Sequence, residues 1–203
     1  MRILKALLHC INISFVAYML TLAFSDKLGA DPVQGLSHFT GKAAIHVLFL
    51  TLLISPLSQY FRISNLIPLR RPMGLYAFFW ATLHISVYIG LDLNFQWRLL
   101  FSELTQRTYL IVGFIAFTLL ISLAITSVKS IQVSMRQHWQ TLHNTIYLIV
   151  LLVPVHYLMS TKSDWVTPSG YLVVSIALLT LRWNKIKRIV NRFSFRRYQH
   201  DKL

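Results

Sequence analysis

The chain has 203 residues, of which 55% are hydrophobic and only 13% are charged, and its mean hydropathy is +0.56. This composition excludes an ordinary soluble domain, in which about 25% of residues are charged. The net charge of +14 could indicate a nucleic-acid partner, but the basic residues lie between and after apolar stretches, where they set membrane topology instead. The single Cys10 excludes an intramolecular disulfide. We therefore expect an all-α, polytopic membrane protein.

Apolar stretches of membrane-spanning length follow one another along the chain. We expect a single integral membrane domain over residues 1–203, a six-helix bundle with spans at about 6–24, 43–58, 73–91, 109–128, 139–160 and 166–183. The basic start and apolar run of the first span resemble a signal peptide, but the run is long for one and contains His9 and Asn12, so we expect an uncleaved span. Residues 25–42 are rich in Gly and Pro and are expected to form a loop, and a polar connection is expected between the third and fourth spans.

The distribution of charge predicts the orientation of the bundle. With six spans, both termini share one side of the membrane with the loops after the second and fourth spans. Those segments hold fifteen of the twenty basic residues, whereas five of the six acidic residues lie on the other side. Because Lys and Arg are retained on the cytoplasmic side, both termini are expected to be cytoplasmic.

The fifth expected span carries two histidines at different depths. His143 and His156 are thirteen residues apart, or about 20 Å along a helix. Ionisable side chains inside a span usually face the bundle interior or a functional site, and neutral imidazole is a common haem ligand. On an ideal helix the two side chains point roughly 140° apart, so a straight helix would not direct both toward one neighbour. Pro154 could bend the helix just before His156.

The third expected span carries His84 in its outer half, at the depth of His156. These two residues are therefore predicted as axial ligands of one haem. The positions of the third span level with His143 are Arg70 and Arg71, which suit a phosphate or propionate better than iron. Other candidate partners of His143 are His138 and His9, and His46 is expected to be a packing or secondary-site residue. A second haem, or a flavin held by Arg70 and Arg71, stays open.

A haem iron with two histidine ligands has no open coordination position and transfers electrons. The loops contain no dinucleotide fingerprint and are too short for a Rossmann domain, so donor and acceptor are expected to be separate partners. Two alternatives compete with this interpretation. One is a metal transporter with histidines as transient ligands, although every Asp and Glu is expected in a loop or the tail. The other is a structural anchor whose histidines only pack.

Three stretches resemble a known family: GADPVQGLSHFTGKAA, RRPMGLYAFFWATLH and LAITSVKSIQVSMRQHWQTLHNTIYLIVLLVPVHYL. Together they are similar to the MsrQ (YedZ) family, the haem-binding membrane subunits of the bacterial MsrPQ methionine sulfoxide reductase system, within the ferric-reductase-like transmembrane superfamily. The resemblance implies a multi-pass protein of the bacterial inner membrane that binds haem b and FMN. It also implies roles in cofactor binding for His84, His143, His156, Arg70 and Arg71, with iron as the metal. Unlike the wider ferric reductase pattern, the third span has no inner histidine.

The same resemblance implies the electron path. Electrons would come from the quinone pool or a cytosolic flavin reductase and pass to MsrP, a periplasmic molybdopterin enzyme that reduces methionine sulfoxide in oxidised envelope proteins. The chain would then be an electron-transfer subunit of a protein-repair system, with no catalytic residue of its own and no nucleic-acid partner.

Overall fold

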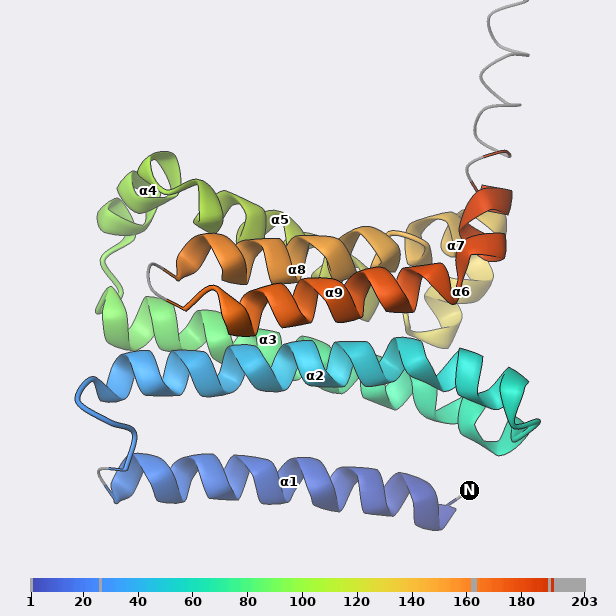
Figure 1. Ribbon diagram of the computed structural model, residues 1–203, viewed down its shortest axis with the longest axis horizontal. Helices are drawn as coiled ribbons and strands as arrows, with labels where there is room; N and C mark the ends of the chain where they lie inside the picture. The colour runs from blue at the N-terminus through green and yellow to red at the C-terminus, as the bar shows by residue number, and fades with distance from the viewer. Residues whose placement is uncertain (1, 26, 162–163, 190, 192–203) are drawn as a thin grey trace, which may run out of the picture.

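The computed structural model describes residues 2–25, 27–161, 164–189 and 191, and every regular element in this part of the chain is helical. The long helices run roughly alongside one another, and short helices lie at their ends (Figure 1). The elements are α1 (Arg2–Phe24), α2 (Pro32–Tyr60), η1 (Ser64–Leu69), α3 (Arg70–Val87), η2 (Tyr88–Asp92), α4 (Trp97–Gln106), α5 (Thr108–Ile125), α6 (Lys129–Met135), α7 (Gln137–His143), α8 (Ile146–Ser160) and α9 (Val166–Thr180).

Helix length and composition identify the segments that can cross a membrane. Five qualify in the described residues: Arg2–Phe24, Pro32–Tyr60, Ser64–Asp92, Thr108–Ile125 and Gln137–Ser160. A sixth is possible if Val166–Thr180 and Trp183–Ile189, which meet at a bend of 72°, count as one span. The predicted all-α, polytopic membrane fold is confirmed.

The core of the bundle lies where α2, α3, α5, α8 and α9 meet. Ile45, Leu48 and Leu52 of α2 are spaced three and four residues apart, so they lie on one face of the helix and are almost fully buried. They pack with Ala77, Leu120, Leu123, Ile149, Val150 and Leu178 from the other helices. Helix α1 is peripheral, with only Asn12 and Met19 buried. Many large apolar side chains on the outside of the bundle are exposed, as lipid-facing surfaces require.

Helix α2 begins at Pro32, inside the stretch where the sequence predicts a loop. The Asp31 carboxylate accepts a hydrogen bond from the backbone N–H of Gln34 at 3.0 Å, and proline suits the first turn of a helix. The helix therefore extends eleven residues before the expected span start at position 43 and includes Ser37 and Gly41.

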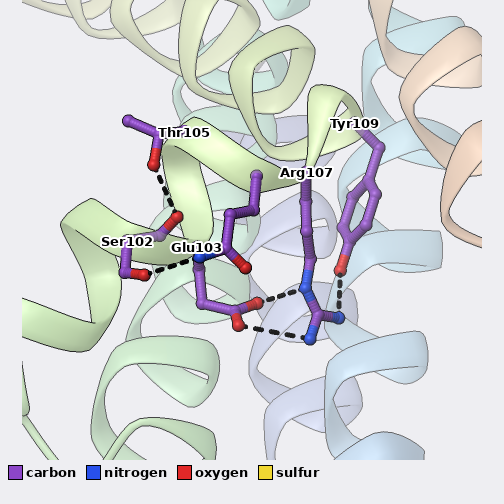
Figure 2. Close-up of polar contacts among 6 residues, drawn as sticks. Ser102, Glu103, Thr105, Arg107 and Tyr109 are labelled. Carbon is purple, nitrogen blue, oxygen red and sulfur yellow. Dashed lines mark hydrogen bonds and ion pairs between the residues drawn. The ribbon is translucent and has the colours of Figure 1, made fainter.

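A further helix, α4, forms within the expected polar connection between the third and fourth spans. Figure 2 shows how its end is joined to α5: Arg107 forms an ion pair with Glu103 and donates a hydrogen bond to the Tyr109 hydroxyl at 3.2 Å. The bond to Tyr109, followed by the charges around it, raises the pKa of Arg107 above its ordinary value. This contact joins the end of α4 to the start of α5.

The segment Gln137–Ser160 is not one continuous helix. Helix α7 ends at His143 and α8 begins at Ile146, with a turn at Asn144 and Thr145 between them. In contrast, α8 continues through Pro154. The segment is therefore interrupted after His143 and not at Pro154.

The two ends of the bundle differ in charge. The start of α1, the helices α6 and α7 and the end of α9 lie at one end (Figure 1), which we call the basic end after Arg62, Arg70, Arg71, Lys129, Arg136 and Arg182. The other end contains α4 and the starts of α2, α5 and α9, and we call it the acidic end after Asp31, Asp92, Glu103 and Asp164. A cytoplasmic location of the basic end remains a prediction.

Candidate functional site

His84 and His156 come from different helices and meet inside the bundle. His84 lies near the end of α3 and His156 near the end of α8. Their ring centres are 6.3 Å apart and the ring planes are inclined by 82°. Both side chains are partly buried, and the ends of α3 and α8 that carry them lie toward the acidic end (Figure 1). The two residues that the sequence predicts at matched depth are therefore neighbours in space.

Backbone carbonyls fix the protonation of both rings. The Nδ1 atom of His84 lies 3.0 Å from the carbonyl oxygen of Ser37, and that of His156 lies 2.7 Å from the carbonyl oxygen of Tyr109. A carbonyl can only accept, so each neutral ring donates from Nδ1–H and keeps its lone pair on Nε2. Histidines that bind a metal usually donate their other ring N–H in this way, to a carbonyl or a carboxylate.

Two glycines give the rings room. A Cβ atom on Gly41 of α2 would lie 3.2 Å from the His84 ring, and one on Gly113 of α5 would lie 2.7 Å from the His156 ring. Glycine inside a helix destabilises it by roughly 0.5–1 kcal/mol relative to alanine. The close approach of the imidazoles is the physical reason for glycine at both positions.

The spacing of the pair can be compared with a metal site. A metal–imidazole bond is about 2 Å long and the ring centre lies roughly 1 Å farther, so two imidazoles on opposite sides of one metal ion have ring centres about 6 Å apart. The observed 6.3 Å agrees with this value. The described residues contain no group of three or more His, Cys, Asp or Glu side chains that could hold a metal ion. Two imidazoles with free Nε2 atoms could supply two ligands to a metal ion, so these residues fit a metal whose remaining ligands come from a cofactor such as haem.

His143 lies at the basic end, away from this pair. Its Nε2 atom is 3.1 Å from the Thr126 hydroxyl, and its ring stacks on Trp139 with centres 3.9 Å apart. The Thr126 hydroxyl has a single proton and is also 2.6 Å from the Ser122 carbonyl oxygen. We assign that proton to the shorter bond, so His143 donates from Nε2–H and keeps its lone pair on Nδ1. This is the opposite tautomer to that of His84 and His156.

The turn after His143 also explains how His143 and His156 can both point toward α5. His143 contacts Thr126, next to the end of α5, whereas His156 contacts Tyr109 near its start. Both histidines thus face α5, although an ideal helix would point them in different directions. The break at Asn144 and Thr145 resets the helix angle between them.

The remaining predicted residues lie apart from the pair. Arg71 is exposed, and Arg70 is partly buried at the start of α3. His9 contacts Tyr76 of α3 rather than His143. His46 is hydrogen-bonded to the Tyr171 hydroxyl at 2.9 Å.

Sequence reasoning missed the residues that position the histidines. Gly113 lies inside an apolar helix, where glycine is unfavourable, so its presence could have indicated a close contact at that position. Gly41 could have indicated the same, but the sequence predicted a loop there, and glycine is common in loops. Ser37 and Tyr109 act through backbone carbonyls, which leave no trace in the sequence. Arg182 was counted only as a topology charge, although it is buried.

These features define a class of protein: a multi-pass helical membrane protein that brings imidazoles from two helices together inside its bundle. Residues 40–154, more than half of the chain, match the family described as ferric reductase like transmembrane component, and the chain belongs to this family. The family commonly binds haem and points to a membrane electron-transfer subunit. The matched region includes His84 and His143 and ends two residues before His156.

Proposed function

We propose that this protein is a haem b electron-transfer subunit in which His84 and His156 would hold the haem iron. The observation that carries the proposal is the geometry of the pair: ring centres 6.3 Å apart, with both Nδ1–H groups donated to backbone carbonyls. When bound, a haem with two histidine ligands supplies one-electron transfer without an open coordination position. A single haem accounts for this pair.

The chain's own residues would orient and insulate the ligands. The carbonyls of Ser37 and Tyr109 hold the tautomer that leaves Nε2 available on both rings. Gly41 and Gly113 allow α2 and α5 to approach the rings closely. Arg107 links Glu103 at the end of α4 to the Tyr109 hydroxyl at the start of α5. Ser37, Tyr109, Gly41 and Gly113 would be positioning residues for His84 and His156.

The direction of transfer follows from the proposed orientation. The histidine pair lies toward the acidic end, which we place in the periplasm, so we propose delivery to a periplasmic acceptor. By family resemblance this acceptor is a molybdopterin methionine sulfoxide reductase of the MsrP type, which repairs oxidised envelope proteins. Electrons would enter at the basic end from quinone or a cytosolic flavin reductase. FMN near Arg70 and Arg71, with His143 as a further cofactor contact, belongs to the same proposal.

The first experiment is an absorption spectrum with a haem-to-protein ratio, measured on protein purified from haem-replete cells. The proposal predicts a b-type spectrum that shifts on reduction with dithionite. His84→Ala and His156→Ala should each remove most of the haem. His46→Ala is the matched control, because His46 is bound to Tyr171 rather than to the pair. Colourless protein, or full haem content in the His84→Ala, His156→Ala double variant, would contradict the assignment.

The second experiment tests the partner. Protein reduced in the absence of oxygen is mixed with an MsrP-type reductase and methionine sulfoxide, and oxidation of the haem is followed by absorbance. The proposal predicts oxidation only when both the reductase and its substrate are present. A haem that stays reduced would leave the electron-transfer role in place and argue against this acceptor.

A further inference from the structure

A proline in α2 leaves a backbone acceptor free near the basic end of the bundle. Pro56 has no N–H, so it cannot donate to the carbonyl oxygen of Leu52, four residues earlier. Arg182, the second residue after α9, takes this place: its guanidinium donates to that carbonyl and, at 3.4 Å, to the Tyr147 hydroxyl. Arg182 is buried, with 7% of its surface exposed. The chain that follows α9 is therefore fastened to both α2 and α8.

The chain turns sharply at this point. The helical segment Trp183–Ile189 is inclined by 72° to α9. Figure 1 shows it turning away from the long helices and running across the end of the bundle. Because the long helices cross the membrane, a segment steeply inclined to them lies along the membrane surface. We call residues Trp183–Ile189 the surface segment.

The surface segment carries positive charge on its exposed side. Lys185, Lys187 and Arg188 are exposed, and the segment contains no acidic residue. The acidic residues that the structure describes all lie at the opposite end of the bundle, and the ion pair in residues 2–25, 27–161, 164–189 and 191 is Arg107–Glu103. No carboxylate in this part of the chain therefore balances the segment, and its charge is complementary to an anionic partner.

The surface segment also presents apolar groups. Trp183 is 62% exposed, and it lines a hollow together with Ile186, Lys187 and Asn191. Tryptophan is enriched where a membrane meets water, and basic helices with an apolar side lie in that interface. The combination of tryptophan, apolar side chains and lysine favours an anionic lipid surface over a soluble acidic protein.

An apolar groove lies beside the turn, where the end of α2 faces the residue before Arg182. Its volume is about 440 Å³, within the range of about 300–1,000 Å³ that is typical of ligand sites. Tyr60, Phe61 and Leu181 on its walls are largely exposed, so the groove is continuous with the lipid-facing surface. The apolar side chains that line it are Leu53, Pro56, Leu57, Tyr60, Phe61 and Leu181. A hydrocarbon chain can therefore enter it from the bilayer.

We propose that the surface segment and this groove bind an anionic phospholipid from the leaflet at the basic end. The phosphate would contact Lys185, Lys187 and Arg188, and one acyl chain would lie in the groove beside Leu181. Arg182 is a positioning residue, because it holds the turn that places the segment next to the groove. The inference does not depend on haem at His84 and His156, so its failure would leave the proposed function in place.

The experiment compares two sets of charges at the same end of the bundle. The full chain is incubated with equal amounts of phosphatidylglycerol, which is anionic, and phosphatidylcholine, and the lipids that it retains are counted by native mass spectrometry. The segment variant carries Lys185→Gln, Lys187→Gln and Arg188→Gln. The matched control carries Arg2→Gln, Lys5→Gln and Lys129→Gln, which remove the same charge from exposed residues of α1 and α6.

Wild type should retain phosphatidylglycerol in preference to phosphatidylcholine. The segment variant should lower this preference by about tenfold to a hundredfold, because each basic residue beside an anionic surface contributes about fivefold to binding. The matched control should lower it by less than about threefold, as expected for charges outside the site. The inference is overturned if wild type shows no preference, or if both variants lose it equally, since general attraction to the basic end would then explain the binding.

Two further measurements test where the lipid lies. Leu57→Trp fills the groove and should reduce phosphatidylglycerol retention, whereas Leu50→Trp, at an exposed position of α2 outside the groove, should not. Unchanged retention in Leu57→Trp would contradict the site. In nanodiscs, phosphatidylglycerol with brominated acyl chains should quench the fluorescence of wild type more than that of Trp183→Phe. Equal quenching would place Trp183 in water, as a soluble acidic partner requires, and the inference would fail.

Discussion

The acidic and basic ends of the bundle each contain histidine contacts to α5, but their chemistry differs. At the acidic end His84 and His156 donate Nδ1–H to carbonyls, so both Nε2 lone pairs remain for a metal. At the basic end His143 has its Nε2–H committed to the Thr126 hydroxyl. Arg70 lies close to it. The comparison teaches that the partner of one ring nitrogen, more than the position of a histidine along the bundle, decides which nitrogen keeps a free lone pair.

The largest expected effect is on haem content, which should depend on the histidines near the acidic end and not on His143 at the basic end. His84→Ala and His156→Ala should each reduce the haem-to-protein ratio by about tenfold or more, because a metal loses affinity steeply when a ligand is removed. His143→Ala should retain the haem of the pair. The measurement is a pyridine haemochrome assay on purified variants. Equal losses in all three would mean that the ends are not distinct, and that His143 also binds iron.

The next effect concerns Gly41 and Gly113, whose lack of a side chain allows the imidazole rings to approach the helices closely. In Gly113→Ala the new Cβ would lie 2.7 Å from the His156 ring, so the imidazole must move, and we expect a destabilisation of about 1–3 kcal/mol together with a lower haem content. Gly41→Ala, with its contact at 3.2 Å, should have a smaller effect.

Gly74→Ala is the control for this series, since its Cβ would meet only the Thr51 methyl group at 3.8 Å. It should be neutral or stabilising by about 0.4–1 kcal/mol. Thermal unfolding and haem content are measured for all three variants. If Gly113→Ala behaves like Gly74→Ala, the ring is not confined as described.

A smaller effect tests the tautomer of His143. Thr126→Val removes the hydroxyl that accepts from Nε2–H and should destabilise the protein by about 0.5–1.5 kcal/mol. The spectrum of the haem at the other end should not change. Nitrogen-15 NMR of labelled histidine reports the tautomer itself. A proton on Nδ1 of His143 in the wild type would reverse our assignment.

The smallest effect lies at the acidic end, where the Asp164 carboxylate accepts a hydrogen bond from the backbone N–H of Thr167 in the first turn of α9. The contacts with Thr167 lower the pKa of Asp164 below its usual value of 3.8. A carboxyl whose pKa falls on folding stabilises the protein above its unfolded pKa, and this contribution disappears as the pH drops through the folded value. Asp164→Asn should therefore unfold slightly more easily than wild type at pH 7. The difference should shrink progressively as the pH falls below 3.8 and the carboxyl becomes protonated in both states, as measured by thermal unfolding over this range.

Much of the site could be predicted from the sequence, but its supports could not. The shared depth of His84 and His156 was predictable, and the structure brings the two rings together. The pairing of Arg70 with Arg71 rested on sequence neighbours, whereas the buried arginine beside Arg70 is Arg182 from the end of α9. Adjacent residues on a helix point in different directions, so proximity in sequence is a poor guide to which side chains share a buried site.

The amino-acid sequence by itself determined the helical membrane fold, the segregation of charge to two ends and the depth of each histidine. These are properties of single helices, because hydropathy and rise per residue act along one axis. Only the tertiary structure decided which ring nitrogen is bonded, why Gly41 and Gly113 must be small, and where Arg182 lies. Those features depend on how helices rotate and approach one another, and the turn at Asn144 and Thr145 sets that rotation for His143 and His156.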